Sequence, residues 1–231
     1  MKFLIISISD SHCHNGPAFT EIAKITSQST EKYCDLHGYD YLILDENPDT
    51  SRQISWGRTF LVKEYLKKYD WILYLDSGIM LMNHTIKLEH LIDERYDVIV
   101  AANEGKIDRI NTGSILWKNS EASYHLIDMM YSDGEFANVG YWEQSTLIKL
   151  LKANPTLLDK PLSDRVKIVS PRVLNSHYHF WFGDENYQHG DFLVHMAGQD
   201  NDFRIETLNK LREFIIRPIP GIQKLVPIWS R

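Results

Sequence analysis

Residues 71–78 read Trp71-Ile72-Leu73-Tyr74-Leu75-Asp76-Ser77-Gly78, in which an uninterrupted apolar run leads directly to a carboxylate. A run of this kind is typical of a central strand that is covered on both faces. Because the ligands of open α/β sheets bind beyond the carboxyl ends of the strands, we expect Asp76 to face a binding crevice. A single Asp after a strand is more often a turn or helix-cap residue, so this expectation needs support from elsewhere in the chain.

Strands and helices alternate on both sides of this stretch. Apolar runs predict further strands over residues 1–9, 39–44, 97–102, 115–117, 166–169 and 191–196. Apolar residues at three- and four-residue steps predict helices over residues 17–37, 56–69, 85–94, 121–131, 142–153 and 202–215. This alternation predicts one α/β domain with a Rossmann-like mixed sheet, mostly parallel and flanked by helices.

Composition limits the classes of partner and compartment. The net charge of −6 offers no basic surface to a nucleic-acid backbone, which excludes nucleic acid as a partner. Cys13 and Cys34 have neither the spacing of metal ligands nor that of a disulfide framework, which indicates a reducing compartment. No stretch approaches the ~20 apolar residues of a membrane span, and the apolar start is too short for a signal peptide. We therefore expect a cytoplasmic protein.

The tract Asn111-Thr112-Gly113-Ser114 leads into the predicted strand 115–117. Gly113 lets a ligand approach the backbone closely, while Asn111 and Ser114 offer donors and acceptors for sugar hydroxyls. An ordinary β-turn ahead of the strand is the alternative interpretation.

Glu143 and Gln144 stand at the start of the predicted helix 142–153, where the helix dipole favours a carboxylate whatever its function. The same carboxylate could stabilise or attack a developing cationic sugar centre.

His195 lies at the end of the predicted strand 191–196. A single His is more often structural than a metal ligand, but an imidazole beside the oxygens of Asp76 suits Mn²⁺ or a similar ion.

In this order, these tracts resemble the retaining glycosyltransferase family of fungal α-1,2-galactosyltransferases, α-1,6-mannosyltransferases and plant xyloglucan xylosyltransferases. The resemblance covers about residues 23–198 and is carried by residues 33–39, 56–76, 111–119, 143–145, 171–176 and 190–198. It implies a GT-A fold. One domain over residues 1–213 would hold a nucleotide-binding half (1–110) and a donor and acceptor half (111–213), followed by a basic, apolar tail (214–231).

The resemblance also implies an activity, which is transfer of a hexose or pentose from a nucleotide diphosphate sugar, with UDP the expected nucleotide, to a glycan or glycolipid. The configuration at the anomeric carbon would be retained. Mn²⁺ or Mg²⁺ would bind the donor phosphates, held by Asp76 and His195, and Glu143 and Gln144 would lie near the anomeric carbon. The donor would contact Asp10, Asp76, Ser77, Asn111, Gly113, Ser114, Gly198 and Arg204.

Two positions depart from the family's pattern. Gly78 replaces the second carboxylate of the family's Asp-x-Asp motif, which removes ligand charge from a hard-cation site. After His195-x-x-Gly198, the first basic residue is Arg204. In order of preference, the metal binds weakly until the donor phosphates add ligands, another group substitutes for the missing carboxylate, or activity has been lost. In the last case the chain would be a carbohydrate- or nucleotide-sugar-binding relative.

Three further segments have competing interpretations. Asp10-Ser11-His12 is similar to the Asp-x-His of metallophosphoesterases, but the other tracts of that family do not occur. Residues 10–14 are better taken as the loop after the first strand, where a GT-A fold holds the nucleotide base, with a solvated turn as the alternative. The aromatic segment 176–183 offers His177, Tyr178 and Trp181 as a sugar-binding wall, with an ordinary aromatic cluster the slightly preferred alternative. The tail 214–231 combines apolar and basic residues and predicts either peripheral membrane contact or a segment folded back on the core.

Overall fold

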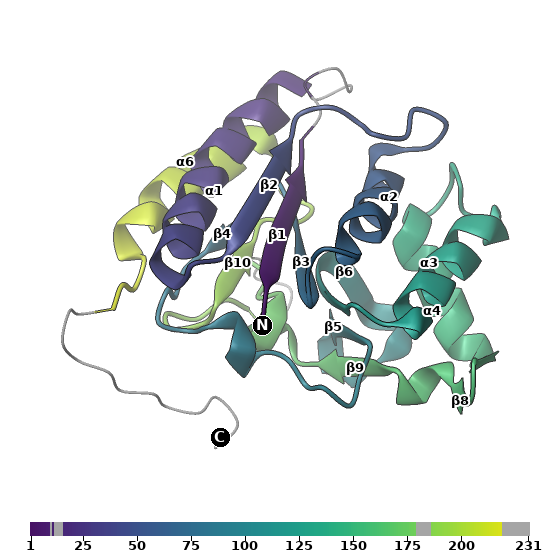
Figure 1. Cartoon of the computed structure of the whole chain (residues 1–231). Coiled ribbons are helices and arrows are strands. Elements are labelled where there is room, and N and C mark those ends of the chain that lie inside the picture. Colours follow the sequence, from purple (N-terminus) through teal and green to yellow (C-terminus); the bar gives the residue numbers. More distant parts are fainter. Residues whose placement is uncertain (10, 12–15, 179–185, 219–231) are drawn as a thin grey trace.

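The computed structural model describes residues 1–9, 11, 16–178 and 186–218. Its centre is a six-stranded sheet in the order β2-β1-β3-β6-β5-β9, in which β6 runs antiparallel to both neighbours and the other pairings are parallel (Figure 1). The predicted mixed, mostly parallel sheet is therefore confirmed. Its strands are β1 (Phe3–Ile8), β2 (Asp40–Leu44), β3 (Trp71–Asp76), β5 (Val98–Ala102), β6 (Ile110–Lys118) and β9 (Val166–Val169).

Helices cover both faces of this sheet. α2 (Ile54–Leu66), α3 (Glu121–Asp133) and α4 (Trp142–Ala153) lie on one side, and α1 (Gly16–His37) and α6 (Asn201–Leu211) lie together on the other (Figure 1). Residues of β3 alternate between the two resulting cores, Ile72 and Tyr74 facing α2, and Trp71, Leu73 and Leu75 facing α1. The continuous apolar run of β3 thus follows from burial on both faces.

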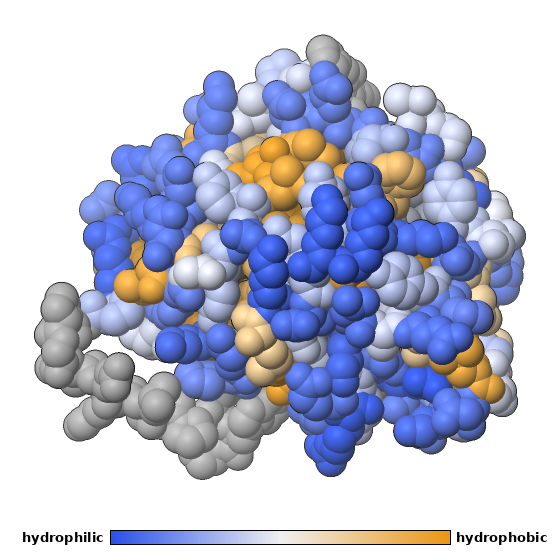
Figure 2. Space-filling model, viewed as in Figure 1, coloured by the Kyte–Doolittle hydropathy of each residue, from blue (hydrophilic) through white to orange (hydrophobic). Residues whose placement is uncertain are grey.

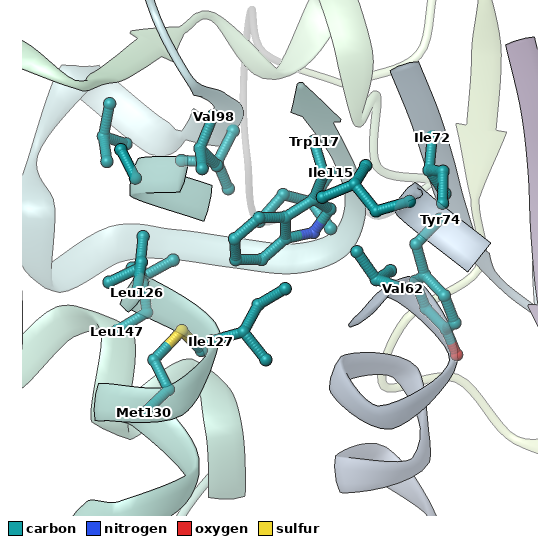
Figure 3. Packing of buried hydrophobic residues seen from close by; sticks show 14 of the residues in the cluster. Val62, Ile72, Tyr74, Val98, Ile115, Trp117, Leu126, Ile127, Met130 and Leu147 are labelled. Carbon is teal, nitrogen blue, oxygen red and sulfur yellow. The ribbon is translucent and has the colours of Figure 1, made fainter. Parts of the chain in front are cut away.

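Aromatic and branched side chains fill the core beneath α2, α3 and α4. The buried ring of Trp117 on β6 points towards Val62 of α2 and Ile127 of α3 (Figure 3). This core fixes α2 and α4 against the sheet, and both helices carry polar residues into the site described below. The smaller elements are β4 (Ile79–Leu81), which pairs with β10 (Leu193–His195), β7 (Thr156–Leu157), β8 (Lys160–Pro161) and α5 (Pro171–Leu174).

The predicted helix over residues 85–94 is wrong, because the structure has only a short 3₁₀ turn there, over Leu88–His90. Side chains bind backbone groups at the start of this segment, including a carbonyl that a helix would have used. The carboxamide oxygen of Asn83 accepts the Thr85 N–H at 3.1 Å, and the Ile86 carbonyl accepts the Tyr33 hydroxyl at 2.8 Å. Such local side-chain bonds compete with a helical ladder.

Several element boundaries also differ from those expected, and α2 runs over Ile54–Leu66 where 56–69 was predicted. The last predicted helix ends at Leu211, with a 3₁₀ turn over Arg212–Phe214. The strand predicted over residues 115–117 is β6, which already begins at Ile110, so the tract from Asn111 to Ser114 lies inside a strand and not in a turn before it. Among the described residues, no helix is long and apolar enough to cross a membrane. Most of the predicted tail, residues 219–231, lies outside the described part.

Candidate active site

Two cavities meet beyond the ends of β1 and β3. One has a volume of about 660 Å³ and is bordered by the start of α4 and by residues 108–113. The other, of about 630 Å³, is bordered by Ser9, Phe19 and Arg204. Apolar residues are also exposed at the molecular surface near this end of the sheet, in the upper part of the face shown in Figure 2. The residues that line both cavities are Ser55, Arg58, Asp76, Trp142 and His195.

A bulge in β6 shapes the junction of the cavities. Val100 of β5 pairs with Ile115, but the next residue, Ala101, pairs with Asn111, so residues 112–114 have no partner on β5. A bulge re-aims the residues that it contains. At Gly113 it brings the backbone so close that an added methyl group would lie 2.8 Å from Asp76 Oδ2 and closer still to the ring of His195. The absence of a side chain at Gly113 therefore leaves a gap between these two groups.

Asp76 and His195 face each other at this gap. Oδ2 of Asp76 lies 3.8 Å from Nε2 of His195, and the Asp76 side chain keeps 32% of its surface exposed. Burial, assisted by the positive charges of Arg204 and Arg58, lowers the pKa of His195 to about 3. The imidazole is therefore neutral at pH 7, and one of its nitrogens has a free lone pair.

Asn175 determines which nitrogen of His195 has the free lone pair. Its amide nitrogen donates to the side-chain oxygen of Asn111 at 2.8 Å and to the Asn111 carbonyl at 3.1 Å. Its carbonyl oxygen lies 2.8 Å from Nδ1 of His195 and must be the acceptor. Nδ1 therefore carries the proton, and the lone pair of Nε2 points towards Asp76. A partner of this kind fixes the tautomer of a histidine that ligates a metal.

A buried guanidinium joins the two carboxylates of the site. Arg58 Nη2 lies 2.8 Å from Asp76 Oδ1, and Nη1 lies 3.1 Å from Glu143 Oε1 and 2.7 Å from the Thr112 carbonyl oxygen. Burial alone would lower the pKa of Arg58, but the two carboxylates raise it, so Arg58 stays charged. Burial raises the pKa of Asp76, and the charge of Arg58 opposes this effect. When both carboxyls are ionised, the three residues carry one net negative charge, which favours a bound cation.

Glu143 and Gln144 lie side by side at the wall of the larger cavity. Burial raises the pKa of Glu143, against the opposing effects of Arg58 and of the Thr112 hydroxyl. Glu143 Oε1 accepts that hydroxyl at 2.8 Å, while Oε2 is buried without a hydrogen-bond partner among the described residues. Gln144 Oε1 accepts the Thr112 N–H at 3.1 Å, which leaves its amide nitrogen as a donor for a ligand.

The smaller cavity has the composition of an anion site with apolar walls. Arg204 and Ser77 line it together with Phe19. The guanidinium of Arg204 lies 5.7 Å from the centre of the Phe19 ring, and its Nε is buried without a partner among the described residues. A guanidinium with free N–H groups is suited to phosphate oxygens.

Of the remaining residues predicted for the site, some line a cavity and others do not. Gly198 lines the larger cavity, as does His177, whose ring stacks on that of His195. Ser114 and Tyr178 line neither cavity, because Ser114 is completely buried in β6 and Tyr178 packs against a buried apolar cluster. Asp10 and Trp181 lie outside the described residues, as does His12 of the tract similar to metallophosphoesterases.

Sequence reasoning missed Arg58, although its position in the helix pattern could have revealed it. Arg58 falls on the face of α2 that also carries Leu61 and Val62, four residues after Ile54. The helical period puts such a position in the core, where an arginine is rare unless it is paired. A charged residue at a core position of the helix before the apolar strand is therefore a usable signal.

Parts of the chain match known protein families. Residues 93–202 match the galactosyl transferase GMA12/MNN10 family, and residues 30–139 match a family described as protein of unknown function, DUF273. An uncharacterized alpha-1,2-galactosyltransferase of Schizosaccharomyces pombe is 28% identical in an alignment 261 positions long, which covers 96% of this chain and 76% of that protein.

Solved structures share the fold. A glycosyltransferase involved in the glycosylation of the major capsid of PBCV-1 superposes with a TM-score of 0.70 and 18% identity, over 91% of this chain and 100% of that one. The glycosyltransferase GlyE of Streptococcus pneumoniae TIGR4 gives a TM-score of 0.53 and 17% identity, over 91% of this chain and 60% of that one. The predicted GT-A fold is thereby confirmed.

Proposed function

We propose that this chain, a glycosyltransferase related to the galactosyl transferase GMA12/MNN10 family, moves a hexose from a UDP-sugar to a glycan or glycolipid with retention at the anomeric carbon. The observation that carries the proposal is the meeting of two cavities at Asp76 and His195. A nucleotide sugar has an anionic diphosphate part and a neutral sugar part. The smaller cavity, lined by Arg204, suits the anionic part, and the larger cavity suits the neutral part. Galactose is the first sugar to test, because the relatives are described as galactosyltransferases.

The donor lies across the junction in this proposal. Its nucleotide occupies the smaller cavity, where Phe19 offers an apolar wall and Arg204 offers N–H groups to the diphosphate. Its sugar occupies the larger cavity, against Gly113 and Gln144. The amide nitrogen of Gln144 and the polar edge of Asn111 then meet the sugar hydroxyls. Placement in this way sets the bond between sugar and phosphate beside Asp76.

A divalent metal ion fits the gap at Gly113 in part. Asp76 Oδ2 and His195 Nε2 present lone pairs to each other at 3.8 Å, and a methyl group on Gly113 would fill the space beside them. Among the described residues, no cluster of three or more His, Cys, Asp and Glu side chains completes a site. Asp76 and His195 would therefore hold Mn²⁺ or Mg²⁺ together with donor phosphate oxygens, and the ion would supply charge neutralisation for the departing diphosphate.

The chain's own groups stabilise the transferring sugar in this proposal. Positive charge develops at the anomeric carbon as the bond to phosphate breaks. Glu143 lies at the cavity wall with Oε1 held by Arg58, so its carboxylate is fixed before the reaction begins. Preorganised charge of this kind lowers the barrier without reorganisation. We assign Glu143 to electrostatic stabilisation of the sugar, and Arg204 to the diphosphate.

Gly78 favours a second candidate function, that of a nucleotide-sugar-binding relative without turnover. The missing carboxylate leaves Asp76 with less ligand charge for a dication than a pair would supply. Both candidate functions predict that the chain binds a nucleotide sugar, but only a transferase breaks the bond between sugar and phosphate. An experiment can therefore separate them.

A thermal-shift panel tests the proposal. UDP-galactose, UDP-glucose and GDP-mannose are each added with and without Mn²⁺, since a specific ligand raises the Tm of the form that binds it. We expect a UDP-sugar to raise the Tm more with Mn²⁺ than without it. Release of UDP under the same conditions, in which water accepts the sugar in place of a glycan, supports transfer, and a Tm shift without release supports the binding relative. If no nucleotide sugar raises the Tm, both candidates fail.

A further inference from the structure

Tyr141 presents an uncovered aromatic ring at the mouth of the larger cavity. The residue lines this cavity and is 69% exposed. Neither its ring nor its hydroxyl has a ring contact or hydrogen bond among the described residues. An aromatic ring buries a large apolar area when it contacts a ligand, so leaving one exposed beside a cavity gives the molecule an unused contact surface.

The backbone holds Tyr141 firmly in this position. Its N–H donates to Ser145 Oγ at 2.9 Å, and its carbonyl accepts the Gln144 N–H at 3.0 Å. The residues on either side, Gly140 and Trp142, both have positive φ angles, of 65° and 50°. For Trp142 this conformation is strained, and such strain persists where the surrounding structure enforces it. The main chain of Tyr141 is therefore fixed, while its ring projects outward.

A carboxylate lines the same cavity as Tyr141. Asp108 belongs to the 3₁₀ turn Ile107–Arg109, which packs against α4, and it lines the cavity with Tyr141. It is exposed and has no hydrogen-bond or ion-pair partner among the described residues. Its neighbour Arg109 is paired with Glu104. The mouth thus offers an apolar ring and a free hydrogen-bond acceptor with negative charge.

We propose that Tyr141 and Asp108 form the acceptor subsite, in which the Tyr141 ring stacks on one face of a neutral hexose and the Asp108 carboxylate accepts its hydroxyl protons. A pyranose ring has an apolar face and a rim of hydroxyl donors, which match these two groups. A nucleotide fits less well, because Asp108 repels phosphate and the smaller cavity already offers Arg204 to it. The inference rests on the proposed function, because it places the acceptor on the open side of the donor sugar.

Transfer kinetics with simple acceptors test the inference. Initial rates are measured with UDP-galactose, Mn²⁺ and the methyl glycosides of mannose, galactose and glucose, and UDP affinity is measured by calorimetry. The variants are Tyr141→Ala, Tyr141→Phe and Asp108→Ala. Phe60→Ala serves as the control, because Phe60 is also an exposed aromatic (46%) but lines neither cavity.

We expect Tyr141→Ala to raise the acceptor KM about five- to tenfold, the value of one aromatic contact, and to leave UDP affinity unchanged. Asp108→Ala raises the same KM, while Tyr141→Phe and Phe60→Ala match the wild type. An unchanged acceptor KM for Tyr141→Ala, or weaker UDP binding by it, overturns this inference alone. A wild-type chain that transfers to none of the glycosides overturns it together with the proposed transfer.

Discussion

Arg58 on α2 lies 2.8 Å from Asp76 at the end of β3, and the same guanidinium reaches Glu143 on α4 at 3.1 Å. One side chain thus sets the distance between the carboxylate at the cavity junction and the carboxylate at the wall of the larger cavity. The three elements that carry these residues are otherwise joined through apolar contacts. The polar geometry of the site is therefore linked directly to the packing of the core.

Replacing Arg58 should lower both stability and donor binding. Arg58→Ala leaves the buried Glu143 carboxylate and the partly exposed Asp76 carboxylate without their cation, and removing one partner of a buried pair costs about 3–5 kcal/mol. Arg58→Lys keeps the charge but loses the fork that reaches both carboxylates, so we expect it to fold and to bind UDP-galactose more weakly. Lys63→Ala is the control, because Lys63 lies on the same helix as Arg58 and forms an exposed ion pair with Asp128 of α3. Equal Tm and donor affinity for Arg58→Lys and wild type would contradict this role.

Two glycines at the junction should respond differently to an added methyl group. Gly113→Ala places a carbon 2.8 Å from Asp76 Oδ2, so we expect loss of Mn²⁺-dependent donor binding. Gly78→Ala meets nothing within 4 Å and should leave donor binding as in the wild type. Gly78→Asp should strengthen Mn²⁺ binding, since it adds a carboxylate in open space beside Asp76. Calorimetry with UDP and Mn²⁺ measures all three, and tight donor binding by Gly113→Ala would disprove the gap's role.

His84 should make stability depend on pH. Burial lowers its pKa to about 4, from 6.5, and it lies 2.9 Å from the Ser29 hydroxyl on α1. Between these pH values the unfolded chain binds more protons than the folded one, so stability is lost as the pH falls from 6.5 towards 4. From pH 8 to pH 5 the loss is about 1–2 kcal/mol, after allowance for solvent screening.

Chemical denaturation of wild type and His84→Asn across this pH range measures the effect. The variant should show a smaller loss of unfolding free energy on acidification. His125→Asn, at an exposed position of α3, should keep the wild-type pH dependence. The same loss in His84→Asn and wild type would show that another group titrates.

Much of the fold could be predicted because apolar patterning and packing agree. β3 is apolar at successive residues since both its faces are covered, and α4 begins and ends where predicted, at Trp142 and Ala153. The helix expected over residues 85–94 failed where the Tyr33 hydroxyl of α1 binds the Ile86 carbonyl, a group that a helix would have used. Such bonds join residues that are distant in the chain, or join side chain and backbone locally. The spacing of apolar residues, from which a helix is predicted, gives no sign of either.

The site residues that could be predicted are polar residues at the ends of strands, where ligands of α/β sheets bind. Asp76 and His195 were expected together, and the structure brings them to 3.8 Å. Ser114 was expected to contact the donor but is completely buried, because the bulge in β6 determines which residues of the tract face the cavity. A bulge depends on the pairing of two strands, which the tract alone does not reveal.

Release of UDP from UDP-galactose in the presence of Mn²⁺, compared between wild type and Asp76→Asn, tests the central claim most directly. The proposed function predicts steady release by the wild type, and a rate lower by about a hundredfold or more in the variant, since charge at the reacting centre is lost. The variant keeps the shape of the side chain, so its Tm checks that it is folded. Equal rates for the two folded proteins would contradict the claim that Asp76 stands at the reacting bond.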